Sequence, residues 1–307
     1  MAGTRMSDIG ALIYAGIDAV FERAAKKPRR LYYPNCVRVK PNKKKEGWYD
    51  TIGNLGPAEI HSEGNPITYD KIEYNNRTII NTEVVAKGVK GSLESIEFDL
   101  ENVVKHQFGE PLVKTLIQKK ERIVADVYNG VFSDTGADGV ALAAANHPLL
   151  NHPTKVNNNL LSGEISPTTI VTAKNRFNAI YDQAGEFFDT EPTHLLIHPN
   201  KMFLALQILN SNLMAIELSN TKNTVQDVMP IKVIVNKYLD YNTSTDVSPW
   251  YMLDKTLDAG CVLQTKGGLN LNTEWDWDIL SYKGVAYEMY GAGMIAPGYG
   301  FVASPGS

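Results

Sequence analysis

The feature that most constrains the fold is a long helical pattern at residues 112–132, followed closely by a short loop of small residues. Apolar side chains in 112–132 recur at spacings of three and four, so a helix there has one continuous apolar face. Asp138-Gly139 then marks a tight turn, and His147-Pro148 closes the small apolar run behind it. A long buried helix of a generic α/β protein has the same local pattern, so the order of the surrounding segments must decide the fold.

Composition places the chain among ordinary globular proteins. Its 307 residues, 43% hydrophobic and 21% charged, suit one elaborate domain or two modest ones. No run reaches the length that a membrane span needs, and residues 9–17, closely flanked by acidic residues, are not interpreted as an export signal. Only Cys36 and Cys261 occur, which excludes a disulfide framework. We expect two free thiols in a reducing cytoplasm, with a single bridge as the alternative.

The net charge of −4 hides a strongly basic segment near the amino end. Residues 22–46 hold ten Lys or Arg against two Glu, a local charge of +8, so the rest of the chain carries −12. Ser7 can cap a helix with one apolar face over residues 9–24, and Pro28 ends it. A basic arm on an acidic body suits nucleic acid or the acidic body of a neighbouring subunit. A solvated tail that binds nothing is the alternative.

Residues 47–96 combine recurrent turn formers with short β-like runs. The runs at 67–74 and 77–85 mix apolar and polar residues, and the second has no strongly apolar face. This pattern predicts a hairpin that projects from the body. Two strands bury too little area to be stable alone, so the hairpin needs a partner surface to be ordered. An ordinary sheet within the subunit's own core is the alternative.

The remaining elements alternate between helical and β patterns. Ser166-Pro167 begins a helix that is predicted to run to about Phe188. From Cys261 the chain is largely β-like to its end. Other short elements are predicted as follows: helices at 99–108 and 200–210, and strands at 193–199, 231–235 and 250–253.

The histidines are weak candidates for chemistry. His147 and His152 lie five residues apart, which is the wrong spacing for two metal ligands on one helical face, and no Cys or carboxylate is close in sequence. A loop fixed by the two following prolines is the preferred interpretation. His194 and His198 bracket a predicted strand, and a catalytic pair there is the less favoured interpretation.

Two further motifs have a bland interpretation. Gly291-Ala-Gly293-Met-Ile-Ala296 matches a dinucleotide-binding pattern, but Pro297 and the glycines after it prevent the helix that would bind the pyrophosphate. Trp275-Asp-Trp277-Asp278 places aromatics beside carboxylates, as sugar-binding sites do, although alternation in an exposed strand gives the same string. We therefore predict no catalytic, cofactor-binding or metal-binding residue.

The Asp-Gly loop carries a resemblance to a known family. Asp138 to Pro148 reads Asp-Gly-x-x-Leu-x-x-x-x-His-Pro behind a long helix, and this resembles the Mu-type branch of tailed-phage major capsid proteins. Tyr290-Gly291 and Gly298 to Phe301 resemble that family's closing strands. The order of arm, projecting hairpin, long helix and Asp-Gly loop also agrees. The resemblance implies an α+β chain with the HK97-like capsid fold.

The resemblance also implies a division of the chain into five regions. They are an N-terminal arm (1–46), an extended hairpin loop (47–96), a peripheral domain with a long spine helix (97–189), an axial domain (190–265) and closing β strands that return to the peripheral domain (266–307).

A capsid protein of this kind is a structural protein and not an enzyme. The resemblance implies self-assembly as pentamers and hexamers into an icosahedral shell around double-stranded phage DNA, with portal and scaffolding proteins as partners and no membrane. It implies assembly in the host cytoplasm and a final place in the virion capsid. An encapsulin nanocompartment shares the fold and is an alternative. A phage-associated hydrolase would need a cluster of titratable residues, and a β-rich tail or adhesion protein would need repeats or mostly β content.

Overall fold

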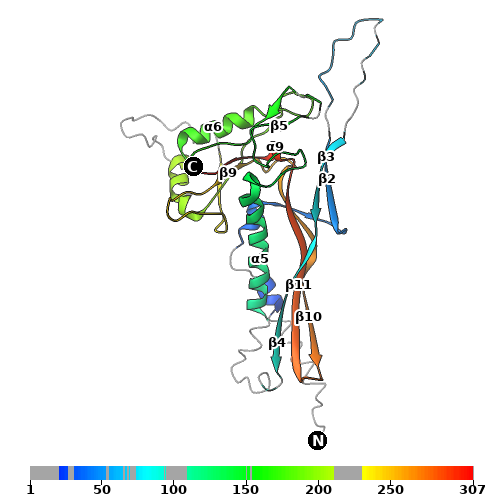
Figure 1. The fold of residues 1–307 in the computed structure, drawn as a ribbon, viewed down its shortest axis with the longest axis vertical. Helices are drawn as coiled ribbons and strands as arrows, with labels where there is room; N and C mark the ends of the chain where they lie inside the picture. Colours follow the sequence, from blue (N-terminus) through cyan, green and yellow to red (C-terminus); the bar gives the residue numbers. More distant parts are fainter. Residues whose placement is uncertain are drawn as a thin grey trace.

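The computed structural model describes residues 21–26, 31–52, 55–64, 66–67, 69, 74–92, 94, 109–149, 151–152, 154–210 and 230–306. These residues form an elongated molecule in which a long helix lies beside a tall sheet, with a compact unit at one end and a projecting hairpin (Figure 1). Of the predicted arm helix at 9–24, only the helical residues 21–26 fall in the described part. The helix predicted at 99–108 lies outside it.

The long helix predicted at 112–132 is confirmed. It is α5, which spans Glu110–Asn129 and continues as a 3₁₀ turn, η1, over Gly130–Phe132. Pro111 lies in the first turn, where its missing N–H leaves no helical hydrogen bond unmade. The buried face of α5, which packs on β4, β10 and β11, includes Leu112, Val113, Leu116, Val124 and Tyr128.

Polar contacts reinforce this packing along the middle of the helix. Lys120 forms a buried ion pair with Glu288 of β11. The carboxylate of Glu121 accepts hydrogen bonds from the backbone N–H groups of Tyr32 and Tyr33, at 2.7 and 2.8 Å. The second contact ties the short helix α2 (Tyr33–Cys36) to α5.

The tall sheet has four strands in the order β1 (Arg38–Pro41), β10 (Gly260–Asp276), β11 (Ser281–Ile295) and β4 (Glu83–Ser92). β1 runs parallel to β10, and the other pairs are antiparallel. α5 lies along one side of the sheet in Figure 1. The strongly β-like pattern predicted from Cys261 onward is confirmed by the long β10–β11 pair.

The projecting hairpin consists of β2 (Glu46–Ile52) and β3 (Tyr74–Asn81), which pair antiparallel beside the upper end of the tall sheet, and the described part of the loop between them extends above the body in Figure 1. The β-like run predicted at 67–74 lies mostly outside the described residues, and the hairpin that was predicted to continue to 96 ends at Asn81. The run at 77–85 is divided at Thr82, and β4 joins the tall sheet instead. The backbone N–H of Thr82 donates to the carbonyl of Lys45 at 2.7 Å, which closes the hairpin there.

A second four-stranded sheet forms the centre of the compact unit. Its order is β12 (Phe301–Ser304), β9 (Trp250–Leu253), β7 (His194–Ile197) and β8 (Lys232–Val235). The strands predicted near 193–199, 231–235 and 250–253 are thus confirmed. The helix predicted at 200–210 is present as η2 (Pro199–Lys201) followed by α7 (Met202–Asn210).

The helix predicted from 166 to about 188 begins as expected but ends early. It is α6, Pro167–Asn178, and Ser166 caps it in a reciprocal capping box with Thr169. The chain then turns: the side chain of Asp182 accepts from the backbone N–H groups of Ala184 and Glu186, both at 2.9 Å. Gly185 has φ +89°, a left-handed conformation that glycine adopts readily. This local turn overrides the helical spacing of the apolar residues.

Strand pairing crosses the boundary predicted at 265/266 between the axial domain and the closing strands. β12, from the closing 301–304, is an edge strand of the compact unit, while β10 begins at Gly260 and belongs to the tall sheet. The chain is completed by two short elements, β5 (His147–Pro148) paired with β6 (Val156–Asn157), and by α9 (Pro297–Gly300). No helix among the described residues has the length and apolar character needed to cross a membrane.

Candidate functional site

The exposed face of the hairpin carries an ordered aromatic and charged cluster. The Trp48 side chain is 60% exposed, and the guanidinium of Arg77 lies 4.6 Å from its ring centroid. Arg77 in turn donates two hydrogen bonds to the carboxylate of Asp50, at 2.5 and 2.9 Å. This contact lowers the pKa of Asp50, so the pair persists into acid solution. Ile79, directly opposite Trp48 in the register, is also exposed.

Apolar side chains continue into the loop beyond the two strands. The described residues there include four large apolar side chains that are mostly uncovered: Leu55, Ile60, Ile67 and Tyr69, with exposed fractions of 58, 99, 63 and 87%. Scattered exposed apolar residues are ordinary, but an exposed group of this kind on a projecting element marks an interaction surface. We call Trp48, Asp50, Arg77 and Ile79 with these four residues the hairpin surface.

The opposite face of the hairpin is fixed to the tall sheet by close packing at glycines. A Cβ atom at Gly291 would lie 1.9 Å from the carbonyl oxygen of Asn81, and one at Gly293 would lie 3.0 Å from the buried side chain of Ile80. Gly47 is equally close to Gln264, whose amide donates to the Thr82 hydroxyl at 2.5 Å. The Gly-x-Gly motif therefore lets β3 cross over β11. The helix that follows the motif, α9 (Pro297–Gly300), has only four residues, which is too short to bind a pyrophosphate at its N-terminus.

A basic groove adjoins the hairpin. It measures 660 Å³ and runs from the end of β1 to the start of β2. Its lining includes three lysines and two aromatic residues: Lys40, Lys44, Lys45, Trp48 and Tyr49. Lys40 is paired with Asp258, at 2.7 Å. The side chains of Lys44 and Lys45 are exposed. The end of the predicted basic arm thus lies beside the hairpin surface, whereas its helical residues 21–26 pack against the start of α5.

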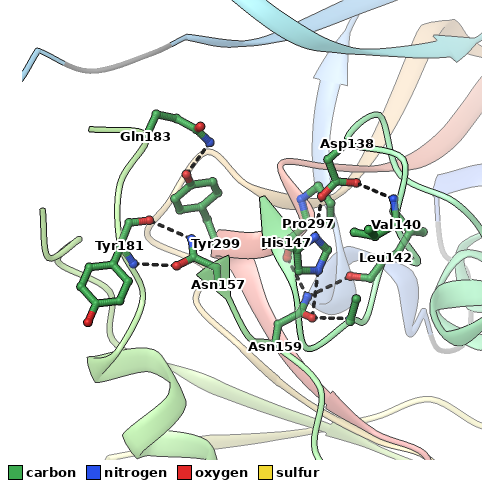
Figure 2. A network of polar contacts seen from close by, with 11 residues as sticks. Asp138, Val140, Leu142, His147, Asn157, Asn159, Tyr181, Gln183, Pro297 and Tyr299 are labelled. Atoms are coloured by element: carbon green, nitrogen blue, oxygen red, sulfur yellow. Dashed lines mark hydrogen bonds and ion pairs between the residues drawn. The ribbon is translucent and has the colours of Figure 1, made fainter. Parts of the chain in front are cut away.

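Beneath the hairpin, the Asp-Gly loop is held by a buried network (Figure 2). His147 is 3% exposed; its Nδ1 lies 2.5 Å from a carboxylate oxygen of Asp138, and its Nε2 lies 3.1 Å from Oδ1 of Asn159. Asn159 Nδ2 donates to the carbonyls of Leu142 and Pro297, at 2.8 and 2.9 Å. The Asp-Gly loop and the distant start of α9 therefore meet at the buried side chain of Asn159.

A second set of contacts, seen beside the first in Figure 2, extends the network. The side chain of Asn157 exchanges two hydrogen bonds of 2.8 Å with the backbone of Tyr181. Gln183 donates to the hydroxyl oxygen of Tyr299 at 2.5 Å. These contacts join β6 to the turn after α6 and the same turn to α9, so Pro148 is only part of what fixes this region, and Pro153 lies outside the described residues.

The four histidines considered for chemistry do not converge. Both ring nitrogens of His147 are engaged by Asp138 and Asn159, so neither can act as a general base toward a substrate. His152 contacts the Thr154 hydroxyl at 3.0 Å, and His194 contacts that of Thr193 at 2.8 Å. His198 stacks on Tyr241, with ring centroids 4.7 Å apart. Burial lowers the pKa of both His194 and His198.

The other candidate groups are also occupied structurally. No group of three His, Cys, Asp or Glu residues in the described part of the chain is arranged to hold a metal ion. Cys36 and Cys261 are free and buried, as expected, and burial raises the pKa of Cys36 to about 12, which leaves an unreactive thiol. Trp275 packs against Trp277 and Tyr282, near the turn between β10 and β11. The absence of a catalytic, cofactor or metal site stays a prediction.

Sequence reasoning missed the central cluster of the hairpin surface. Trp48 and Asp50 lie 27 or more positions before Arg77, and only the hairpin register brings them together. The available signal was the alternation Glu46, Trp48, Asp50, which places three functional side chains on one face of a strand.

Comparison with known proteins places the fold. The capsid of Cyanophage Pam1 is similar at TM-score 0.56 and 13% identity, covering 90% of this chain and 92% of that chain. The capsid of Cyanophage P-SCSP1u is similar at TM-score 0.53 and 14% identity, and the match covers 90% of this chain and 88% of that chain. The SrpI encapsulin complex from Synechococcus elongatus is similar at TM-score 0.55 and 11% identity, and the match covers 90% of this chain and 86% of that chain. A search of curated proteins finds no match.

These structures define the class of the fold, which is the HK97-like α+β fold predicted from the sequence. The phage capsid protein family matches residues 76–300, most of the chain. The chain therefore belongs to the phage capsid protein family, and it is a structural major capsid protein. The resemblance seen at Asp138 to Pro148 is confirmed for family and fold, while the Mu-type branch stays a prediction.

Proposed function

We propose that this protein assembles as pentamers and hexamers into an icosahedral shell around double-stranded phage DNA, and that it performs no catalysis. The observation that carries the proposal is the hairpin surface, an ordered element that projects from the body with its aromatic and apolar side chains uncovered. In a single subunit these side chains face solvent. In a shell they would lie against a neighbouring subunit.

The chemistry of the hairpin surface suits a stable interface. Trp and Arg are the residues that most often dominate binding energy, particularly where neighbouring groups hold them in place. Arg77 is held by Asp50 and Trp48, so little side-chain entropy remains to be lost on docking. Standard interfaces bury about 800 Å² on each partner, a size that a long hairpin can supply.

The basic arm, 22–46, supports the same proposal. Its local +8 charge on an otherwise acidic chain favours docking on the acidic body of a neighbour. Packaged DNA is the other partner that the charge suits. Portal and scaffolding proteins, and assembly in the host cytoplasm before incorporation in the virion, belong to this proposal as further partners and location.

The five-region division of the chain is also part of the proposal. In it the arm, the hairpin and the body that contains the long helix have separate roles in assembly. Because β4 belongs to the tall sheet, the working hairpin is 46–81, and the closing strands serve both sheets. The hairpin reaches outward, whereas α5 and the tall sheet, to which residues 31–41 of the arm are fixed, form the rigid support.

Electron microscopy of the purified protein tests the proposal. We expect closed shells of uniform size that disappear when the protein is diluted or the hairpin is shortened between residues 55 and 69. A protein that stays monomeric at high concentration and in the presence of its co-expressed phage proteins would contradict the proposal.

A protein nanocompartment is the second candidate, because an encapsulin complex has a similar fold at TM-score 0.55. The contents of purified shells distinguish the two. Phage-type shells from infected cells should contain nuclease-resistant double-stranded DNA, whereas a nanocompartment should contain a defined protein cargo.

A further inference from the structure

The buried amide of Asn159 has only one possible orientation. Its Nδ2 donates to two carbonyl oxygens, of Leu142 and Pro297, and its Oδ1 accepts from the backbone N–H of Ala144 at 2.8 Å. If the amide were rotated by 180°, its oxygen would face two carbonyl oxygens and its NH₂ would face an N–H group. Oδ1 therefore points toward His147, and it can only accept.

The fixed amide determines the protons on His147. Nε2 faces Oδ1 of Asn159 at 3.1 Å, so Nε2 must carry a hydrogen and donate. Nδ1 lies 2.5 Å from Oδ2 of Asp138, and a neutral ring protonated at Nε2 would direct a lone pair at the carboxylate there. A second proton must lie between these two atoms. We propose that His147 and Asp138 hold this additional proton at neutral pH, as an imidazolium–carboxylate pair that latches the Asp-Gly loop.

The surroundings of the ring leave Asp138 as its charged partner. Side chains of His147 and Asp138 are 3 and 8% exposed, so the pair is shielded from water and salt. A small cavity beside the ring is lined by apolar, amide and hydroxyl groups, and Tyr299 is the other titratable residue there. Its hydroxyl is bonded to Gln183. No lysine, arginine or second carboxylate belongs to the described lining of this cavity.

The latch lies where it can affect the hairpin. The same cavity is bordered by Thr51, Asn76 and Thr78, from the upper parts of β2 and β3. The network also holds Pro297, at the start of α9 and just after β11. Loss of the additional proton would set two lone pairs against each other within hydrogen-bond distance, and the Asp-Gly loop would separate from Asn159 and the hairpin base.

The sign of the pH dependence follows from the proton count. In the unfolded chain the two side chains are solvated separately, whereas the folded subunit keeps the additional proton between them. The folded state then binds more protons than the unfolded state, so the free energy of unfolding falls as the pH rises.

Nitrogen NMR of assembled protein labelled with ¹⁵N-histidine measures the charge directly. At neutral pH we expect both ring nitrogens of His147 to be protonated. The His147 signals can be identified by their loss in His147→Gln. A His147 ring with one bare nitrogen at neutral pH would overturn the proposal, whatever the effect of any variant on folding.

A matched pair of variants tests the consequence. In Asp138→Asn, the amide NH₂ can donate to a neutral Nδ1, so the additional proton is no longer needed. We expect the wild-type unfolding temperature to fall by about 2–4 °C or more from mildly acid to mildly alkaline pH, and the fall to vanish in Asp138→Asn. His152→Gln should keep the wild-type slope. Equal slopes in wild type and Asp138→Asn would contradict the latch.

Discussion

The body and the hairpin of this capsid protein use their aromatic and apolar residues in opposite ways. In the body, Tyr128 and Tyr290 are 1% exposed and pack between α5 and the tall sheet. In the hairpin, Trp48 and Ile79 are 60 and 52% exposed, although Arg77 and Asp50 hold the tryptophan in place. The body is therefore stabilised by its own contacts, whereas the hairpin presents ordered side chains that only another molecule can cover.

The largest effect is expected in the body, at the buried pair of Lys120 and Glu288. The Lys120 ammonium also lies 5.0 Å from the ring centroid of Tyr290. Glu288→Ala leaves a buried charge without its partner, and should lower the free energy of unfolding by about 3–5 kcal/mol. Chemical denaturation measures this. The double variant Lys120→Met with Glu288→Leu should recover most of the loss, and failure to recover it would show that packing, not charge, dominates here.

A smaller effect is expected at the junction of the two regions. Gly291→Ala places a methyl group against the carbonyl of Asn81, so β3 must move away from β11. We expect a loss of about 1–3 kcal/mol in stability, with assembly impaired more than folding. Gly268 has open space around it and provides the matched control. If Gly268→Ala impairs assembly equally, the close crossing is not what fixes the hairpin.

The hairpin surface should affect assembly but not folding. Trp48→Ala is expected to change the free energy of unfolding by less than about 0.5 kcal/mol, because the side chain is exposed. It should weaken each subunit contact by about 2 kcal/mol, as at binding hot spots. Light scattering during assembly, compared with Trp277→Ala, gives the measurement. Trp277 is 69% exposed in the turn between β10 and β11, and equal effects would remove the special role of the hairpin.

The smallest effect is expected at the basic turn beside the hairpin. Replacing Lys43, Lys44 and Lys45 by Glu should weaken assembly, and more so at low salt, because exposed charges are screened as the salt concentration rises. Sedimentation at two salt concentrations measures this. If empty shells form normally and only the packaging of DNA is reduced, the arm contacts nucleic acid and docking on a neighbour is wrong.

The sequence was sufficient where the cause of structure is local. The apolar face of α5 and the Ser166 cap of α6 depend on residues a few positions apart, and both predictions are confirmed. The length of α6 was wrong because Ile180 keeps the helical spacing and is buried without being helical. The Asp182 side chain forms the turn there, and an apolar pattern does not reveal it.

The sequence was insufficient where contacts are distant. The assignment of β4 to the tall sheet depends on Thr82, whose partners Lys45 and Gln264 lie 37 or more positions away. The His147 network joins Asp138 to Pro297 through Asn159, so spacing alone showed only that a metal pair was unfavourable. Spacing revealed neither the buried partners of His147 nor the Trp48 cluster.

Hydrogen exchange of the hairpin tests the central claim, that its surface is covered by another subunit. Amide exchange should be compared in isolated subunits and in assembled shells, with β10 and β11 as the internal reference. We expect residues 46–52 and 74–81 to gain protection in the shell, while the reference strands are equally protected in both states. Equal protection of the hairpin in the two states would contradict the account.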